Sequence, residues 1–499
     1  MATPPFPPFD QSRYAWRISY DDPAKHIREA QGGEILEDVW NRFLYGEQKL
    51  FLAVDLQLSS PISTTNFLSR AKEAWIEIRF YVPTVGGSTE QAKDGTSLVT
   101  YRAIKDQAEA TAWANHTVRL FEGSTDMDAA RVEIGKLTIP EPTGEQTFIY
   151  IVPRSETSYG VILFTHHTPF DGAGTKIVMN RYIRSLAQHI DNPFLAQSQQ
   201  FHWGEEVKNL LPAVPQILGP AEATEGDDYQ KTLGAVMGSL ISGARSRYGF
   251  REHIPNFGPG ATRRIAYSFP IEDSLKLFQA SRDLGFTINH IAHAAICLVC
   301  LYDNPPTAST SSDAAFTFNG LVDARGRLAP QYTGKEGYPG YCLAMSSINI
   351  PISVATAISA SGEKVQLLAV AEYIKTEYAK QRGFPCFLAV SSQEIDILVT
   401  GVKEGTATPS PPWMGPSYAG DGRGETYLDP EHGGATGKPT IKVLDYFTSL
   451  NKHDPGPFFR SFSWNNKYTL SADYNEAAMP AEAVKGFMQK WQDLITLIS

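Results

Sequence analysis

The stretch SYGVILFTHHTPFDG (residues 158–172) decides the fold class of this chain. Its first half is apolar and rich in β-forming residues, which predicts a buried strand, and Asp171-Gly172 predicts a tight turn. Helical spacing follows over 174–190. A strand, a tight turn and a helix place the turn residues at the edge of a sheet, where binding groups often lie. The two histidines of this stretch are therefore the first candidates for chemistry.

Strand and helix patterns continue on both sides of this unit. The predicted strands are 51–58, 146–153, 263–270, 316–325, 345–353, 441–450 and 461–475. The predicted helices are 23–43, 66–81, 105–120, 271–285, 287–302, 363–381 and the C-terminal segment. The stretch 401–437 is rich in Gly, Pro and Ser, which predicts a long surface loop.

Because strands and helices occur in both halves, we expect an α/β protein with two subdomains and a seam between them. The predicted division is an N-terminal subdomain over 1–205, a crossover or linker over 206–262, and a C-terminal subdomain over 263–499. Turn-rich strings such as LLPAVPQILGP and NFGPGAT indicate the linker, which has one helix inside it.

Composition excludes several classes of protein. Hydrophobic residues make up 42% of the 499 residues and charged residues 20%, so a large core can form and global disorder is excluded. The net charge of −10 disfavours a nucleic-acid binder and a polybasic membrane-surface protein. Four cysteines are too few for a disulfide framework, the opening lacks a secretory signal, and the longest apolar run, near 294–302, is too short to span a bilayer. We therefore expect a soluble, reduced, cytoplasmic protein.

The residues alone leave two interpretations of His166 and His167 open. An imidazole with a pKa near 6.5 can take and return a proton at neutral pH. Successive side chains of a strand point to opposite faces, so the two rings cannot share one site if the strand continues through them, which disfavours a di-histidine metal site. Asp171 lies in a turn between Pro169 and Gly172 and is expected to fix the loop rather than perform chemistry. The histidines are either functional or simply buried and hydrogen-bonded.

The string HHTPFDG resembles the HHxxxDG signature of the CoA-dependent acyltransferase superfamily. That superfamily includes chloramphenicol acetyltransferase, the plant BAHD acyltransferases and the condensation domains of nonribosomal peptide synthetases. FTINHIAHAAICLVC resembles the family's helix after a Thr-x-Asn turn, and NGLVDARGRLAP resembles its Asp-x-Arg-x-Arg-Leu strand. The resemblance covers most of the chain, from residue 51 to the C-terminal helix. It implies a chloramphenicol-acetyltransferase-like fold with an active-site tunnel where the two subdomains meet.

The resemblance also implies a role for each residue of the motif. His167 would be the general base that takes the proton of an acceptor hydroxyl, and no acyl-enzyme or metal would be needed. Asp171 and Gly172 would be structural. Arg325 would be the arginine partner of Asp171, with Arg327 as the second candidate.

The opening PPFDQSRYAWRISYDDPAKHIREAQGGE is similar to fungal trichothecene 15-O-acetyltransferases. This similarity implies transfer of an acetyl group from acetyl-CoA to the C-15 hydroxyl of a sesquiterpenoid. The expected partners are acetyl-CoA and the alcohol, without metal, nucleic acid or membrane, and a monomer is expected. The alternatives are acylation of another fungal metabolite, amide formation as in a condensation domain, or a catalytically silent binder of a CoA ester or metabolite. The intact pair of His167 and Asp171 disfavours the silent binder.

Other features of the sequence point less clearly to function. The BAHD string DFGWG is absent, and PSYAGDGRGE (416–425) is a candidate to shape the CoA end of the tunnel in its place. Cys297 and Cys300 share one apolar helix with His290 and His293. We interpret all four as core residues, since no further metal ligands accompany them.

Overall fold

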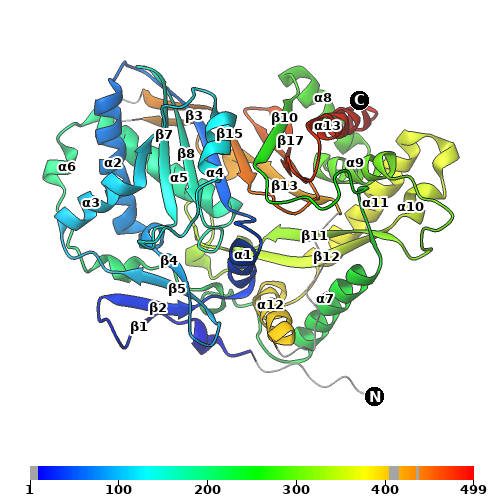
Figure 1. Ribbon diagram of the computed structural model, residues 1–499, viewed down its shortest axis with the longest axis horizontal. Coiled ribbons are helices and arrows are strands. Elements are labelled where there is room, and N and C mark those ends of the chain that lie inside the picture. Colours follow the sequence, from blue (N-terminus) through cyan, green and yellow to red (C-terminus); the bar gives the residue numbers. More distant parts are fainter. Residues whose placement is uncertain (1–8, 404–414, 434–437) are drawn as a thin grey trace.

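Two halves of mixed helix and strand lie side by side in the computed structural model, which describes residues 9–403, 415–433 and 438–499 (Figure 1). The helices are α1 (Gly32–Phe43), α2 (Thr64–Tyr81), α3 (Gln107–Thr117), α4 (Met127–Gly135), α5 (Gly172–Asp191), α6 (Leu195–Ser198), α7 (Asp227–Arg245), α8 (Ile271–Asp283), α9 (Ile288–Asp303), α10 (Ser353–Thr356), α11 (Glu363–Arg382), α12 (Phe387–Lys403) and α13 (Ala481–Thr496). Short 3₁₀ turns lie at Gln11–Tyr14, Pro83–Gly86, Glu206–Asn209, Val214–Gln216, Arg325–Arg327, Pro330–Tyr332, Ser359–Ser361 and Gly424–Thr426.

The strands form four sheets. They are β1 (Arg17–Ile18), β2 (Lys25–Glu29), β3 (Leu50–Leu58), β4 (Ser88–Gln91), β5 (Ser97–Arg102), β6 (Val118–Leu120), β7 (Thr147–Ser155), β8 (Ser158–Thr165), β9 (Arg247–Tyr248), β10 (Thr262–Ser268), β11 (Ala315–Asp323), β12 (Leu343–Pro351), β13 (Ser417–Arg423), β14 (Glu431–Gly433), β15 (Pro439–Leu450), β16 (Phe458–Trp464) and β17 (Lys467–Asn475). The strand orders are β1-β2-β5-β4, β14-β15-β3-β8-β7-β6, β10-β17-β16-β13 and β12-β11-β9.

The six-stranded sheet of the first half is buried on both faces. Along β3, Leu52 and Val54 face a core shared with α2 and α5, whereas Phe51 and Ala53 face the core under α4. Strand side chains alternate between faces, so two apolar faces produce an almost continuous apolar run. This double burial explains why β3, β7 and β8 were predictable from composition.

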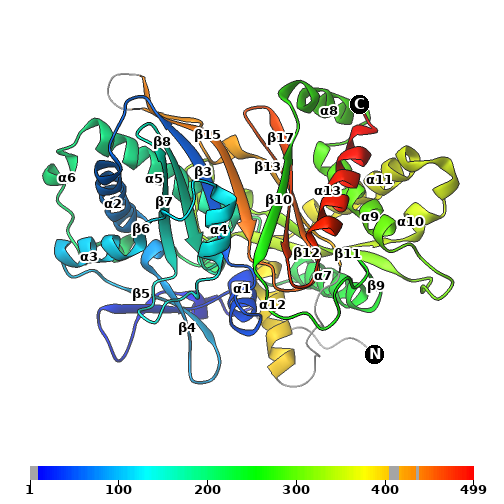
Figure 2. The same cartoon turned by 45° about the horizontal axis from the view of Figure 1, so that its top comes forward.

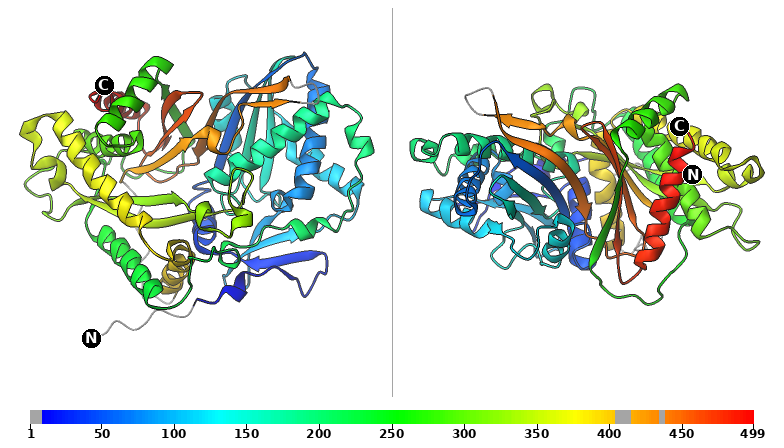
Figure 3. Two further views of the ribbon diagram at one scale, coloured as in Figure 1. Left: turned by 180° about the vertical axis from the view of Figure 1, so that it is seen from behind. Right: turned by 90° about the horizontal axis from the view of Figure 1, so that it is seen from above.

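Two strands from the C-terminal part of the chain complete this first-half sheet. β15 pairs antiparallel with β3 from Ile441 to Leu450, and β14 pairs with β15 at the sheet edge (Figure 2). In Figure 3 the orange β14–β15 segment lies against the blue β3 of the first half. To supply β14 and β15, the chain crosses from the second half back to the first. The predicted division into folding units at residues 205 and 263 stays a prediction.

The second half packs its sheets around the apolar helix α9. Thr287 caps this helix, since its Oγ1 accepts a hydrogen bond from the His290 amide at 3.3 Å while His290 Nδ1 accepts one from the Thr287 amide at 3.2 Å. Cys297 and Cys300 are free thiols in the core around α9. The linker region contributes α7, whose Leu233 packs with α12.

The single strand predicted over 461–475 is wrong, because β16 ends at Trp464 and β17 begins at Lys467. Two further local predictions are wrong for the described residues. The helix predicted over 23–43 begins only at Gly32, because Lys25–Glu29 forms β2 and pairs with β5, a partner that local periodicity cannot reveal. The loop predicted over 401–437 instead includes the end of α12 together with β13 and β14. Parallel pairing with β16 holds β13 in strand conformation despite its glycines. Residues 404–414 and 434–437 of that prediction lie outside the described part of the chain.

Candidate active site

β8 ends at Thr165, so both histidines lie in the turn that follows the strand. His166 is 0% exposed, and its amide donates a hydrogen bond to the Gln146 carbonyl at 2.9 Å. Its Nδ1 accepts a hydrogen bond from the Thr168 amide at 3.1 Å. The His166 ring is thus tied to the backbone of its own turn.

His167 faces a different environment, between α1 and the segment before β12. Its Nδ1 lies 3.5 Å from Glu37 Oε1, and its ring hydrogen-bonds to its own backbone. Its ring centroid lies 5.7 Å from that of Tyr341. The residue keeps 7% of its surface exposed, in contrast to His166. Of the two histidines, only His167 therefore keeps any exposed surface.

Burial lowers the pKa of both imidazoles to about 3. The guanidinium of Arg460 lowers the pKa of His167 further, and the charges of Arg42 and Lys49 do the same for His166. Both rings are therefore neutral at pH 7, but the lone pair of His166 Nδ1 already accepts the Thr168 amide, so only His167 can offer a free lone pair. A general base needs such a lone pair before it can take a proton.

Asp171 joins the two halves of the chain. It is the N-cap of α5, where its Oδ1 accepts the Gly174 amide at 2.7 Å. The same oxygen accepts Arg325 Nη2 at 2.7 Å, and Oδ2 accepts the Cys342 amide at 2.7 Å. Asp171 is fully buried, so its charge is balanced by donors from the second half of the chain.

Arg325 is the arginine that pairs with Asp171. Its guanidinium also donates to two backbone carbonyls of the segment that leads into β12, at 2.8 and 2.7 Å, and to Asp323 Oδ1 at 2.9 Å. Arg327 pairs with Glu222 instead, at 2.6 Å. The buried Asp171–Arg325 pair thus holds the histidine turn against the loop that carries Tyr341.

Neither Asp171 nor Gly172 adopts left-handed backbone geometry. Asp171 has extended backbone with φ −94° and ψ −179°, and Gly172 simply opens α5. A Cβ at Gly172 would have no atom within 4 Å, whereas a Cβ at Gly174 would overlap the carbonyl oxygen of Pro339. The close approach of the two halves therefore requires glycine at position 174.

We expect Gly174→Ala to lower the free energy of unfolding by about 1–3 kcal/mol, because backbone must move to admit the methyl group. Gly172→Ala is the matched control and is expected to change stability by less than about 1 kcal/mol. Urea unfolding followed by circular dichroism measures both. Equal losses in the two variants would contradict a steric requirement specific to Gly174.

The segment PSYAGDGRGE lies beside the site as strand β13 and the turn after it. Asp421 of β13 pairs with Arg460 Nη1 at 3.2 Å and accepts the Thr448 hydroxyl at 2.7 Å. Burial would raise the pKa of Asp421, but Arg460 and Lys176 hold it below its usual value. Arg460 of β16 also acts electrostatically on His167.

The family model described as 15-O-acetyltransferase Tri3 matches residues 6–356, which is more than half of the chain. The chain belongs to the Tri3 family. It is therefore an acyl-CoA-dependent acetyltransferase, and the predicted enzyme class is confirmed.

Curated relatives of this Tri3-family chain span almost its whole length. The putative 15-O-acetyltransferase SAT12 of Stachybotrys chartarum is 25% identical over 96% of this chain and 90% of its own. The trichothecene 15-O-acetyltransferase TRI3 of Fusarium sporotrichioides is 23% identical over 97% of this chain and 96% of its own.

Solved structures confirm the predicted fold. The TRI3 structure from Fusarium sporotrichioides matches with a TM-score of 0.86 at 18% identity and covers 100% of both chains. The starter condensation domain of rhizomide synthetase RzmA matches with a TM-score of 0.58 at 10% identity and covers 94% of both chains. The Tri3-family chain therefore has the two-subdomain fold that the motif implied.

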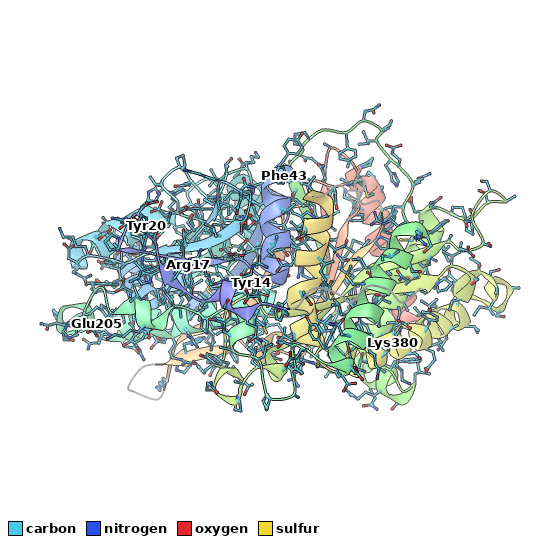
Figure 4. All side chains as sticks on the ribbon, turned by 90° about the horizontal axis from the view of Figure 1, so that it is seen from below. Tyr14, Arg17, Tyr20, Phe43, Glu205 and Lys380 are labelled. Atoms are coloured by element: carbon cyan, nitrogen blue, oxygen red, sulfur yellow. The ribbon has the colours of Figure 1, made fainter. Side chains whose placement is uncertain are left out.

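Sequence reasoning missed two residues beside His167, namely Glu37 and Tyr341. Glu37 lies on α1, which packs against α12 in the middle of the molecule and ends at Phe43 (Figure 4). The polar residues of α1 recur at positions 34, 37, 38 and 41 on one helix face, a pattern that ordinarily predicts a face in contact with water. That face is buried, whereas Phe43 is 67% exposed.

Two cavities of about 290 Å³ each lie elsewhere in the Tri3-family chain. One cavity lies between β3, β15 and β10. It is lined by Tyr446, by Phe462 and by the ion pairs Arg154–Asp55 and Arg264–Asp128. The other lies between α2, α3 and α5. His167 lines neither cavity, although the first lies in the seam.

The remaining candidates from the sequence have structural contacts. His293 Nδ1 lies 3.0 Å from the Tyr378 hydroxyl, and His290 belongs to the cap of α9. Within the described residues, no group of three or more His, Cys, Asp or Glu side chains could hold a metal ion. No single described helix is long and apolar enough to cross a membrane, and α8 and α9 meet that test only as a pair bent by 93°.

Proposed function

We propose that this enzyme transfers the acetyl group of acetyl-CoA to the C-15 hydroxyl of a trichothecene, with His167 as the general base. The observation that carries the reaction is the partly exposed, neutral His167 imidazole next to the buried Asp171–Arg325 pair. The names of the relatives from Stachybotrys and Fusarium support the acceptor.

The reaction needs one base and two bond changes. His167 Nε2 takes the proton of the hydroxyl while the oxygen attacks the thioester carbonyl carbon of acetyl-CoA. The resulting tetrahedral intermediate collapses, the carbon–sulfur bond breaks, and the imidazolium returns the proton to the departing thiolate. The products are the acetate ester and free CoA, and His167 is neutral again.

Asp171 and Arg325 act on this step through the backbone. Asp171 caps α5 directly after the histidine turn, and Arg325 binds the loop before Tyr341. The pair therefore fixes the distance between the histidine turn and the loop that carries Tyr341. Since one chain supplies both segments, we propose that a monomer is sufficient for activity. The cytoplasmic location stays a prediction of the sequence.

The test is release of free thiol from acetyl-CoA with a panel of alcohols that includes a 15-hydroxy trichothecene. We expect release with that acceptor, in a 1:1 ratio to the acetate ester found by mass spectrometry. His167→Ala is the control and is expected to release thiol about 10²- to 10⁴-fold more slowly than the wild type.

Each other outcome removes a defined part of the proposal. Release with a different alcohol alone would overturn the trichothecene C-15 acceptor and favour another fungal metabolite. Amide formation with an amine in the same panel, without ester, would favour condensation chemistry. Binding of acetyl-CoA without release for any acceptor would favour a silent binder.

A further inference from the structure

Lys176 on α5 differs from the other buried lysines of the described chain, Lys49 and Lys452. Lys49 donates a hydrogen bond to a backbone carbonyl at 2.6 Å, and Lys452 donates one to Glu47 Oε1 at 2.8 Å. Lys176 makes no hydrogen bond within the described residues, and its ion-pair partner Asp421 lies 3.9 Å away. Buried N–H donors without an acceptor cost free energy, so this position calls for an explanation.

Asp421 is already engaged by other donors. Its Oδ2 accepts the Thr448 hydroxyl at 2.7 Å, and Arg460 Nη1 lies 3.2 Å from both carboxylate oxygens. A separation of 3.9 Å between nitrogen and oxygen is an ion pair and is too long for a hydrogen bond. The charge of Lys176 is therefore countered by Asp421, while its N–H groups stay available for another oxygen.

Two more buried donors of this cluster lack acceptors within the described residues. Tyr446 on β15 is 3% exposed, its Oη has no hydrogen-bond partner, and its ring centroid lies 5.4 Å from Lys176 Nζ. Arg460 on β16 is also buried, and its Nε has no hydrogen-bond partner. Unmet donors from α5, β15 and β16 thus gather at one place. Since buried donors are nearly always paired in folded proteins, such a cluster suits an oxygen-bearing ligand.

The cluster lies close to the histidine turn. Lys176 and Gly172 are four residues apart and lie on the same face of α5. Helical side chains lean toward the N-terminus, which for α5 is the turn that carries His167. A Cβ at Gly172 would have no atom within 4 Å, so there is open space on the side toward which Lys176 leans. A substrate at the histidine turn can therefore present an oxygen to these donors.

We infer that Lys176 donates hydrogen bonds to an oxygen atom of a substrate bound at His167. Arg460 Nε and Tyr446 Oη are the further donors of this site. The inference rests on the proposed function. Two oxygens have the required chemistry. One is the thioester carbonyl oxygen of acetyl-CoA, which gains negative charge when the hydroxyl attacks, and the other is an oxygen function of the sesquiterpenoid acceptor.

The test is Lys176→Met in the thiol-release assay, because methionine keeps an unbranched side chain and removes the N–H donors. We expect kcat/KM for the alcohol to fall about 10-fold or more. The midpoint of thermal unfolding should not fall, since the lysine makes no hydrogen bond in the free enzyme.

The kinetic constants distinguish the two oxygens. A lower kcat with both KM values unchanged assigns the thioester carbonyl, because that interaction strengthens only in the transition state. A raised KM for the alcohol with kcat unchanged assigns the acceptor. Arg184→Met is the matched control, since Arg184 lies two turns further along the same face of α5 and pairs with Glu336. It should keep kcat/KM within about 2-fold of the wild type.

An unchanged kcat/KM in Lys176→Met would overturn the inference, and so would an equal loss in Arg184→Met. A raised KM for acetyl-CoA alone would also overturn it, because the lysine would then serve the phosphates of CoA. A loss of thermal stability that matches the loss of activity would show that Lys176 supports the fold instead. If the wild type itself forms no ester, the proposed function fails and the inference falls with it.

Discussion

His167→Ala is expected to lower kcat by about 10²- to 10⁴-fold, the usual contribution of a positioned general base. Alanine cannot take the proton of the acceptor hydroxyl. The chain is expected to fold without this ring, because the ring hydrogen-bonds only to its own backbone and lies 3.5 Å from Glu37. Steady-state thiol release measures the loss. Acetyl-CoA affinity, measured by calorimetry, should stay within about 3-fold of the wild type, since binding and chemistry are separate in this variant.

His166→Ala is the control for this assignment. It removes the hydrogen bond to the Thr168 amide inside the turn, so its main effect should be on stability. A larger loss of kcat in His166→Ala than in His167→Ala, with folding and binding intact, would show that the base is assigned to the wrong ring.

The pH dependence of kcat/KM in the same assay tests the lowered pKa of His167. Burial lowers the pKa of His167 to about 3, so the ring stays unprotonated as the pH falls from 8 to 6. The wild-type kcat/KM should therefore show no acid limb near 6.5, the ordinary pKa of histidine. A fall in kcat/KM centred at 6.5 would contradict a base held neutral by burial.

Asp171→Ala is expected to lower the free energy of unfolding by about 3–5 kcal/mol, because it leaves a buried guanidinium without its counter-charge. The Arg325 side chain is 3% exposed, and its Nη2 donates to Asp171 Oδ1 at 2.7 Å. The variant also loses the cap of α5 and the acceptor of the Cys342 amide. Urea unfolding measures the loss, and activity should fall with it.

Asp323→Ala provides a matched control on the same arginine. Asp323 pairs with Arg325 at 2.9 Å, but its side chain is 34% exposed. Exposed ion pairs contribute little, so we expect a loss of less than about 1 kcal/mol. A loss equal to that of Asp171→Ala would mean that burial of the Asp171–Arg325 pair is not what makes it important.

Strands and helices buried in a periodic pattern were predictable from the sequence. Both β8 and α9 are almost entirely apolar. β8 is short and contains β-branched residues, whereas α9 is 16 residues long, so length and composition indicate their type without any knowledge of neighbours. β2 and β13 were missed because partners far along the chain hold them in strand conformation. A polar or glycine-rich strand can form wherever a neighbour supplies the backbone hydrogen bonds.

The residues of the candidate site likewise fall into those that the sequence predicted and those that only the structure revealed. The motif resemblance pointed to His167, to Asp171 and to Arg325 in preference to Arg327, because these residues form short strings in the sequence. Glu37 and Tyr341 form no string with them, and they meet His167 only because α1 and the loop before β12 converge on the turn. A polar stripe on a helix ordinarily faces water, so nothing local marked Glu37 as buried.

The sequence alone thus determined the α/β class, the two halves and the histidine turn, because alternation, apolar runs and motif spacing are local properties. Only the tertiary structure decided which of the two rings keeps exposed surface, which residues surround it and where β15 pairs. Those features depend on burial and on contacts between distant segments. The same burial that hides His166 holds His167 neutral, and no pattern of neighbours along the chain contains that information.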